Sequence, residues 1–125
     1  MKKNTYITNL NQRTSLVERT FCHEGNDYVE IFAYDKLNNM IEYLGTSYGD
    51  MQYYYSSDYI VFVKDEDVEF AFDTTRFCFI TNEVAKMRAF NKILRSSKID
   101  FTKEESDLKI EEEERYMINK YYIKK

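Results

Sequence analysis

The 125-residue sequence contains no tryptophan or proline and only three glycines, two cysteines and one histidine. Gly25, Gly45 and Gly49 are too widely spaced to form a loop that cradles phosphates, which excludes nucleotide binding of that kind. Cys22 and Cys78 lack the C-x-x-C spacing of many metal and redox sites, and a zinc centre needs about four ligands. We therefore expect no zinc site and two reduced, buried thiols, with a disulfide between them as the alternative.

The sequence contains few residues that could form a catalytic site. His23 is the sole histidine, and it would have to meet Cys78 for a thiol to gain a general base. The candidate carboxylates for a catalytic Mg²⁺ are Asp58, Asp65, Asp67, Glu69 and Asp73. Most of them fall at a predicted hairpin tip or on the polar face of a strand, where solvated charge is the usual finding. We expect no enzyme activity, no metal and no cofactor.

The sequence also lacks a long apolar run and a signal-like start. No segment approaches the roughly 18 to 20 apolar residues that span a bilayer, and the chain turns polar within its first five residues. Apolar residues nevertheless occur along the whole chain, although 32% of it is charged, so we expect one folded cytoplasmic domain over 1–125. Residue types encoded by AT-rich codons are abundant and suggest a low-GC bacterium, or one of its phages or plasmids.

Up to residue 80, β-branched and aromatic residues alternate with polar ones over short runs, which is typical of strands. We predict strands at Ser15 to His23, Tyr28 to Tyr34, Met40 to Thr46, Tyr59 to Lys64, Val68 to Asp73 and Phe77 to Ile80, and a loop or short strand at Tyr53 to Tyr55. Their connections are too short for crossover helices. The pattern therefore predicts a meandering antiparallel sheet of about five to seven strands.

From residue 81 to 125 the pattern becomes helical. Thr81 or Asn82 can cap a helix whose apolar stripe, Val84, Met87, Phe90 and Leu94 with Ile93 beside it, should pack on the sheet. The T-x-x-E form of 102–105 predicts the start of a second helix that continues to about residue 123. The expected fold class is α+β, with a strand-rich part over 1–80 followed by two C-terminal helices over 81–125.

The formal charge of −4 hides a segregation of signs. Acids dominate 50–73 and 104–114, whereas 86–98 carries only bases. Arg88, Lys92 and Arg95 recur at helical spacing and would form a basic stripe on the face opposite the apolar one. Such a stripe could contact nucleic-acid phosphates, although an acidic protein of pI near 5.1 is unusual for that role. The acidic 104–114 segment and the basic 86–98 segment could also pair, either within one chain or between two copies, which would give a homodimer.

Tyrosine is the most unusual count, with 12 in the chain. Tyr residues are enriched where proteins recognise other proteins, because the ring is rigid and its tip is polar. On a strand, Tyr54 would face away from Tyr53 and Tyr55, which leaves at least one ring for the surface.

These observations lead to one main functional hypothesis. We expect a non-enzymatic binding protein, encoded by a phage or mobile element, that docks on a larger host protein and evades host defence. Its concrete form is an inhibitor of the anti-CRISPR or anti-restriction kind, which blocks a nucleic-acid-binding groove through its acidic surface. The predicted partner-binding residues are Asp58, Asp65, Glu66, Asp67, Glu69, Tyr53, Tyr54 and Tyr55. The alternative is a nucleic-acid-binding accessory or regulatory protein that uses Arg88, Lys92 and Arg95.

Overall fold

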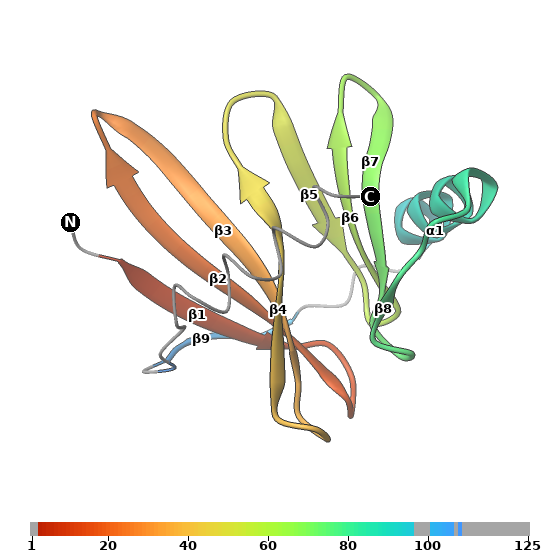
Figure 1. The fold of residues 1–125 in the computed structure, drawn as a ribbon, viewed down its shortest axis with the longest axis horizontal. Helices are drawn as coiled ribbons and strands as arrows, with labels where there is room; N and C mark the ends of the chain where they lie inside the picture. The colour runs from red at the N-terminus through yellow and green to blue at the C-terminus, as the bar shows by residue number, and fades with distance from the viewer. Residues whose placement is uncertain (1–2, 97–100, 107, 109–125) are drawn as a thin grey trace.

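The strands follow the alternation seen in the sequence, and they form two sheets rather than one (Figure 1). The computed structural model describes residues 3–96, 101–106 and 108. The strands are β1 (Asn4–Asn9), β2 (Thr14–His23), β3 (Asn26–Asp35), β4 (Met40–Ser47), β5 (Met51–Tyr55), β6 (Tyr59–Lys64), β7 (Asp67–Asp73), β8 (Cys78–Phe79) and β9 (Lys103–Glu105), and the helix is α1 (Glu83–Arg95). Within the described residues the protein is thus a mostly-β α+β structure.

The first sheet has the strand order β4-β3-β2-β1-β9 and the second has the order β5-β6-β7-β8, with antiparallel neighbours throughout. The predicted antiparallel meander is confirmed, but the prediction of a single sheet is wrong. The chain passes from one sheet to the other between β4 and β5. At that point Gly45 lies so close to the ring of Phe62 that an added Cβ would be 3.1 Å from Cε2. A glycine here lets the two sheets approach closely.

A hydrophobic core fills the space between the two sheets. The first sheet contributes Leu16, Ile31 and Leu44, and the second contributes Phe62 and Phe72, all of them buried. Core residues alternate along a strand, as Ile31 and Ala33 do in β3 and Ile60 and Phe62 do in β6, so one face of each sheet points into this layer.

Helix α1 covers the other face of the second sheet, so the layers run sheet, sheet, helix (Figure 1). Asn82 caps the helix by accepting a hydrogen bond from the Ala85 N–H at 3.0 Å, as its place before the helical pattern predicts. The residue buried beneath the helix is Ala89, with Phe90 and Ile93 partly buried beside it.

The predicted orientation of the helix is therefore wrong. Val84, Met87 and Leu94 were expected on the sheet, yet all three are exposed. The small side chain of Ala89 lets the helix approach the apolar outer face of the second sheet closely, and the ring of Phe90 packs on Tyr54 with centroids 5.5 Å apart. The fit of Ala89, Phe90 and Ile93 against the sheet decides the orientation here, rather than the total hydrophobicity of a stripe.

A polar network, which we call the latch, joins the two sheets at one end. The Asn11 side-chain amide donates to the Ser57 carbonyl at 2.6 Å and to the Thr74 hydroxyl at 3.0 Å. Thr74 in turn donates to Ser57, and the Thr14 hydroxyl donates to the Thr74 carbonyl. Thr14 and Thr74 are fully buried, so the latch satisfies polar groups that burial would otherwise leave unpaired.

Three further sequence predictions are corrected by the structure. Residues 4–9 form β1, for which no strand was predicted, and 103–105 form β9 on the edge of the first sheet instead of starting a helix. Pairing with β1 outweighs the capping-box preference, which is a local effect of about 1 kcal/mol. Cys22 and Cys78, expected to be buried, are both exposed free thiols. Ser106 and Leu108 are not helical either, and the remainder of the predicted second helix, 107 and 109–123, lies outside the described residues.

Candidate functional site

Three turns lie at the end of the molecule opposite the latch: the β2–β3 and β6–β7 hairpin turns and the β4–β5 turn that connects the two sheets (Figure 1). Their positions are linked through the fold. The ring of Tyr28 at the start of β3 stacks on Tyr48 of the β4–β5 turn, with centroids 4.5 Å apart. Met51, just after that turn, pairs with Lys64 at the end of β6. The three turns therefore belong to one surface.

This surface carries a high density of negative charge, and we call it the acidic end. Its exposed carboxylates are Glu24, Asp27, Asp50, Asp65, Glu66, Asp67 and Glu69. The basic side chains at this end are Lys64, which is exposed, His23, whose Nε2 lies 3.8 Å from a Glu24 carboxylate oxygen, and Lys3, whose ammonium lies 5.1 Å from the centre of the Phe21 ring. Carboxylates gathered this way produce a negative potential that extends into solvent over about a Debye length, roughly 8 to 10 Å at moderate salt.

The β6–β7 turn keeps two acidic residues in an unfavourable backbone conformation. Asp65 and Glu66 have φ values of 50° and 71°, in the left-handed region that favours glycine. The β2–β3 turn has the same geometry but places Gly25 at its second position, with a φ of 80°. Asn-Gly or Asp-Gly is the usual pair for such two-residue turns. The β6–β7 turn therefore retains a charge at Glu66 that costs the hairpin stability.

Aromatic rings accompany the carboxylates at this end. Phe21, Tyr28 and Tyr48 form a continuous stack, with centroids 5.1 Å apart for the first pair. Tyr48 is 47% exposed, and Phe70 of β7 is 43% exposed. Rigid aromatic side chains beside charge are typical of surfaces that bind proteins.

The structure brings together only part of the predicted partner-binding set. Asp65, Glu66, Asp67 and Glu69 share the acidic end, but Asp58 lies in the β5–β6 turn beside the latch, where its carbonyl accepts from the Thr74 N–H. The three tyrosines of β5 also divide between two faces, as strand alternation predicts. Glu24, Asp27 and Asp50 complete the surface, and sequence reasoning missed them because they come from other turns.

The tyrosines have structural partners. Tyr53 points between the sheets and donates a hydrogen bond to Glu18, whose side chain is only 4% exposed. Burial, and then the Glu18 carboxylate, raise the pKa of the Tyr53 hydroxyl, so it remains a donor at neutral pH. Burial likewise raises the pKa of Tyr55, which packs on Phe101. Tyr54 lies on the helix side against Phe90.

Glu18 is a buried charge that the sequence analysis did not single out. Its carboxylate lies 3.0 Å from the Lys103 ammonium, so it joins β9 to β2 as well as accepting from Tyr53. Its burial could have been predicted from the sequence, because Glu18 follows the inward-facing Leu16 by two residues in β2 and therefore lies on the same face of the strand. Through Lys103 the Glu18 carboxylate links β9 to β2, and through Tyr53 it links the first sheet to the second.

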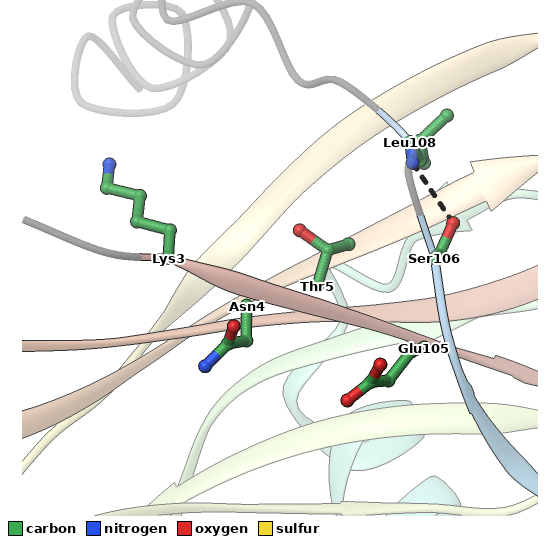
Figure 2. A pocket seen from close by; sticks show the side chains of 6 residues that line it. All are labelled: Lys3, Asn4, Thr5, Glu105, Ser106 and Leu108. Atoms are coloured by element: carbon green, nitrogen blue, oxygen red, sulfur yellow. Dashed lines mark hydrogen bonds between the residues drawn. The ribbon is translucent and has the colours of Figure 1, made fainter.

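A polar pocket of about 550 Å³ lies where β9 ends beside the start of β1 (Figure 2). It is lined by Lys3, Asn4, Thr5, Glu105, Ser106 and Leu108. The Ser106 hydroxyl accepts from the Leu108 N–H at 3.1 Å, and the Ser106 N–H donates to the Thr5 carbonyl at 2.9 Å. Lys3 and Glu105 place one positive and one negative charge in its lining.

The described residues show neither a metal-binding cluster nor a membrane-spanning helix. Their His, Cys, Asp and Glu side chains form no group of three or more that could hold a metal ion. Helix α1, the helix that the structure describes, is too short to cross a membrane.

Comparisons with models of protein families, with curated proteins and with solved structures gave no match. Function must therefore be inferred from the surfaces themselves.

Proposed function

We propose that this protein is a non-enzymatic binding module that docks its acidic end on a basic surface of a larger protein. The seven exposed carboxylates on three neighbouring turns carry the proposal. A negative surface of this kind speeds encounter with a positive groove and selects its orientation there. The exposed rings of Tyr48 and Phe70 would supply the apolar contact that charge alone lacks.

In its most concrete form, the partner is a nucleic-acid-processing enzyme of a bacterial host, and the module is an inhibitor of the anti-CRISPR or anti-restriction type encoded by a phage or mobile element. A groove that binds nucleic acid is lined with Lys and Arg, because phosphate contacts dominate its affinity. The acidic end offers carboxylates in place of those phosphates. The AT-rich codon usage implied by the composition is the support for the phage or mobile-element origin.

Glu66 supports a binding role independently of the charge count. A charged residue is kept at a φ of 71°, where glycine would be more stable. Backbone strain of this kind tends to occur at functional sites, where the side chain is worth more than the local stability it costs.

The test is a pull-down from a low-GC bacterial lysate, treated with nuclease, with partners identified by mass spectrometry. The tip variant replaces Asp65, Asp67 and Glu69 by Lys. The control variant makes the same charge change at three exposed acids away from the acidic end, Asp58, Glu104 and Glu105. We expect the wild type and the control to retain the same partner and the tip variant to lose it, because the groove would then meet positive charge.

A competition experiment and the identity of the captured molecule complete the test. Nucleic acid added in excess should displace the captured partner, since both would occupy one groove. Equal capture by the tip variant would overturn acidic docking. If nucleic acid is recovered instead, and is lost when Arg88, Lys92 and Arg95 are replaced by Ala, the protein is the nucleic-acid-binding accessory of the alternative hypothesis.

A further inference from the structure

The outward face of helix α1 exposes a row of apolar side chains. Val84, Met87 and Leu94 are 62%, 44% and 61% exposed, while the opposite side of the helix packs through Ala89 on the second sheet. A single exposed apolar residue needs no explanation. Three on one helix face, on the outermost layer of the molecule, form a surface that gains free energy when it is covered.

The spacing of this row is that of a helix-pairing seam. Val84, Met87, Asn91 and Leu94 are separated by three, four and three residues, so they fill the a, d, a and d positions of two heptads. Asn91 is exposed and lies at the second a position. A polar Asn at an a position is a known device for fixing the register of paired helices. The surface therefore fits a second helix that runs along α1.

The charged side chains that flank this row on α1 indicate which charges a partner helix should carry. Arg88 and Arg95 occupy the e positions beside the seam, and both are exposed. Lys92 is turned toward the sheet, with its ammonium 5.7 Å from the Tyr59 ring centre. Glu83, the acid of this helix, already lies 2.8 Å from the Lys86 ammonium. The flank of the seam is thus positive and calls for carboxylates on the partner.

A second copy of α1 does not meet this requirement. In an antiparallel pair the e positions face each other, so Arg88 of one copy would lie opposite Arg95 of the other, and like charges repel. In a parallel pair each e position faces a g position. Glu83, the g residue that would face Arg88, already pairs with Lys86 of its own helix, and Phe90, the g residue that would face Arg95, is packed against Tyr54. Nucleic acid would satisfy the arginines but would leave Val84, Met87 and Leu94 without apolar contact.

We propose that helix α1 is a docking site for an acidic amphipathic helix of another protein, whose apolar a and d side chains cover Val84, Met87 and Leu94 and whose glutamates meet Arg88 and Arg95. This site is separate from the acidic end and does not depend on the function proposed for that end. A protein with both surfaces can hold two partners at once.

The test measures binding of two labelled peptides to the full-length protein by fluorescence anisotropy. Each peptide spans about three heptads, with Leu at a and d and one Asn at a central a position. One carries Glu at its e and g positions, and its control carries Lys there. We expect the Glu peptide to bind at least about tenfold more tightly than the Lys peptide, and this preference to fall between about 0.1 M and 1 M salt.

Variants of the helix separate the two contributions. Replacing Met87 and Leu94 by Gln, which suits a helix about as well, should weaken the Glu peptide by about tenfold or more. Leu37→Gln is the matched control, because Leu37 is also exposed but lies in the β3–β4 turn, and it should bind as the wild type does. All three side chains are exposed, so the fold should be retained, which circular dichroism verifies.

A charge swap gives the sharpest outcome. Arg88→Glu with Arg95→Glu should reverse the preference, so that the Lys peptide binds more tightly than the Glu peptide. Equal affinity for the two peptides, or a preference that the swap leaves unchanged, would overturn the proposal. So would tighter binding of a DNA duplex or of phosphatidylserine vesicles than of the Glu peptide, or self-association that Leu94→Gln abolishes.

Discussion

Asp35 fixes the end of β3, and replacing it by Asn should destabilise the whole fold. Its buried carboxylate accepts hydrogen bonds from the Arg13 guanidinium, at 3.3 and 3.0 Å, and from the Asn38 side chain at 2.9 Å. It also accepts from the backbone N–H groups of Leu37 and Asn38, at 3.0 and 3.2 Å. One residue thereby holds the β3–β4 turn and anchors the loop that carries Arg13.

The Asp35→Asn change preserves the shape of the side chain but alters three of these five hydrogen bonds. Its amide oxygen can still accept from the two backbone N–H groups, whereas its NH₂ group would face the donors of Arg13 and Asn38. A hydrogen bond to a charged group contributes about 1.5–3 kcal/mol, and losing one partner of a buried ion pair costs about 3–5 kcal/mol. Because the Arg13 side chain is 30% exposed, water can replace part of the loss. We expect about 2–3 kcal/mol of destabilisation.

Urea denaturation followed by circular dichroism measures this change. The same loss should appear as a fall of about 8–12 °C in Tm for a chain of this length. Asp27→Asn is the matched control, since it removes the same charge from an exposed position of the same strand, and it should change stability by less than about 0.5 kcal/mol.

The effect of Asp35 should depend on pH in one direction. Burial alone would raise the pKa of the carboxyl, but hydrogen bonds from Asn38, Arg13 and the turn backbone hold it below its ordinary value. The folded protein thus binds this proton less tightly than the unfolded chain. The contribution is complete above about pH 4, the unfolded pKa, and is lost as pH falls through the folded pKa. A loss no larger than that of Asp27→Asn at pH 7, or one that persists unchanged at about pH 2, would refute the reasoning.

Three other substitutions test separate parts of the structure. Tyr53→Phe removes the donor to the buried Glu18 carboxylate and should cost about 1.5–3 kcal/mol of unfolding free energy, whereas an unchanged urea midpoint would contradict that bond. Gly45→Ala should cost about 1–3 kcal/mol, because its Cβ would meet the Phe62 ring at 3.1 Å, and a stability equal to the wild type would show that the sheets can separate freely. Glu66→Gly should stabilise the β6–β7 hairpin by about 0.5–1 kcal/mol while weakening partner capture, and a stabilised variant with full capture would remove Glu66 from the docking surface.

The strands of this protein were predictable where the side-chain alternation was strong. β2, β3, β4, β6 and β7 appear close to their predicted bounds, because each is a run rich in β-branched and aromatic residues that is bounded by turn residues. Their division into two sheets was not predictable, since nothing in the alternation marks the passage from β4 to β5. β9 could not be predicted, because its three polar residues form a strand by pairing with β1 and not because of their own strand propensity.

The candidate site was predictable in part for the same physical reason. Asp65, Glu66 and Asp67 are adjacent in sequence and stay together at one turn. Asp58 belongs to the opposite end, because one strand length separates it from Asp65. Glu24, Asp27 and Asp50 join the acidic end only because the turns that carry them lie side by side in the folded protein. That arrangement depends on the assembled sheets and cannot be predicted from the sequence.

The latch has a consequence for how this protein can change over time. It ties the sheets together through Asn11, Thr14 and Thr74 at the end remote from the acidic turns. The turns at the acidic end can therefore accept substitutions or inserted residues without loosening the junction between the sheets. Under the docking function proposed above, a lineage of such chains could change its partner through substitutions in three short turns, while selection for folding acts on the other end.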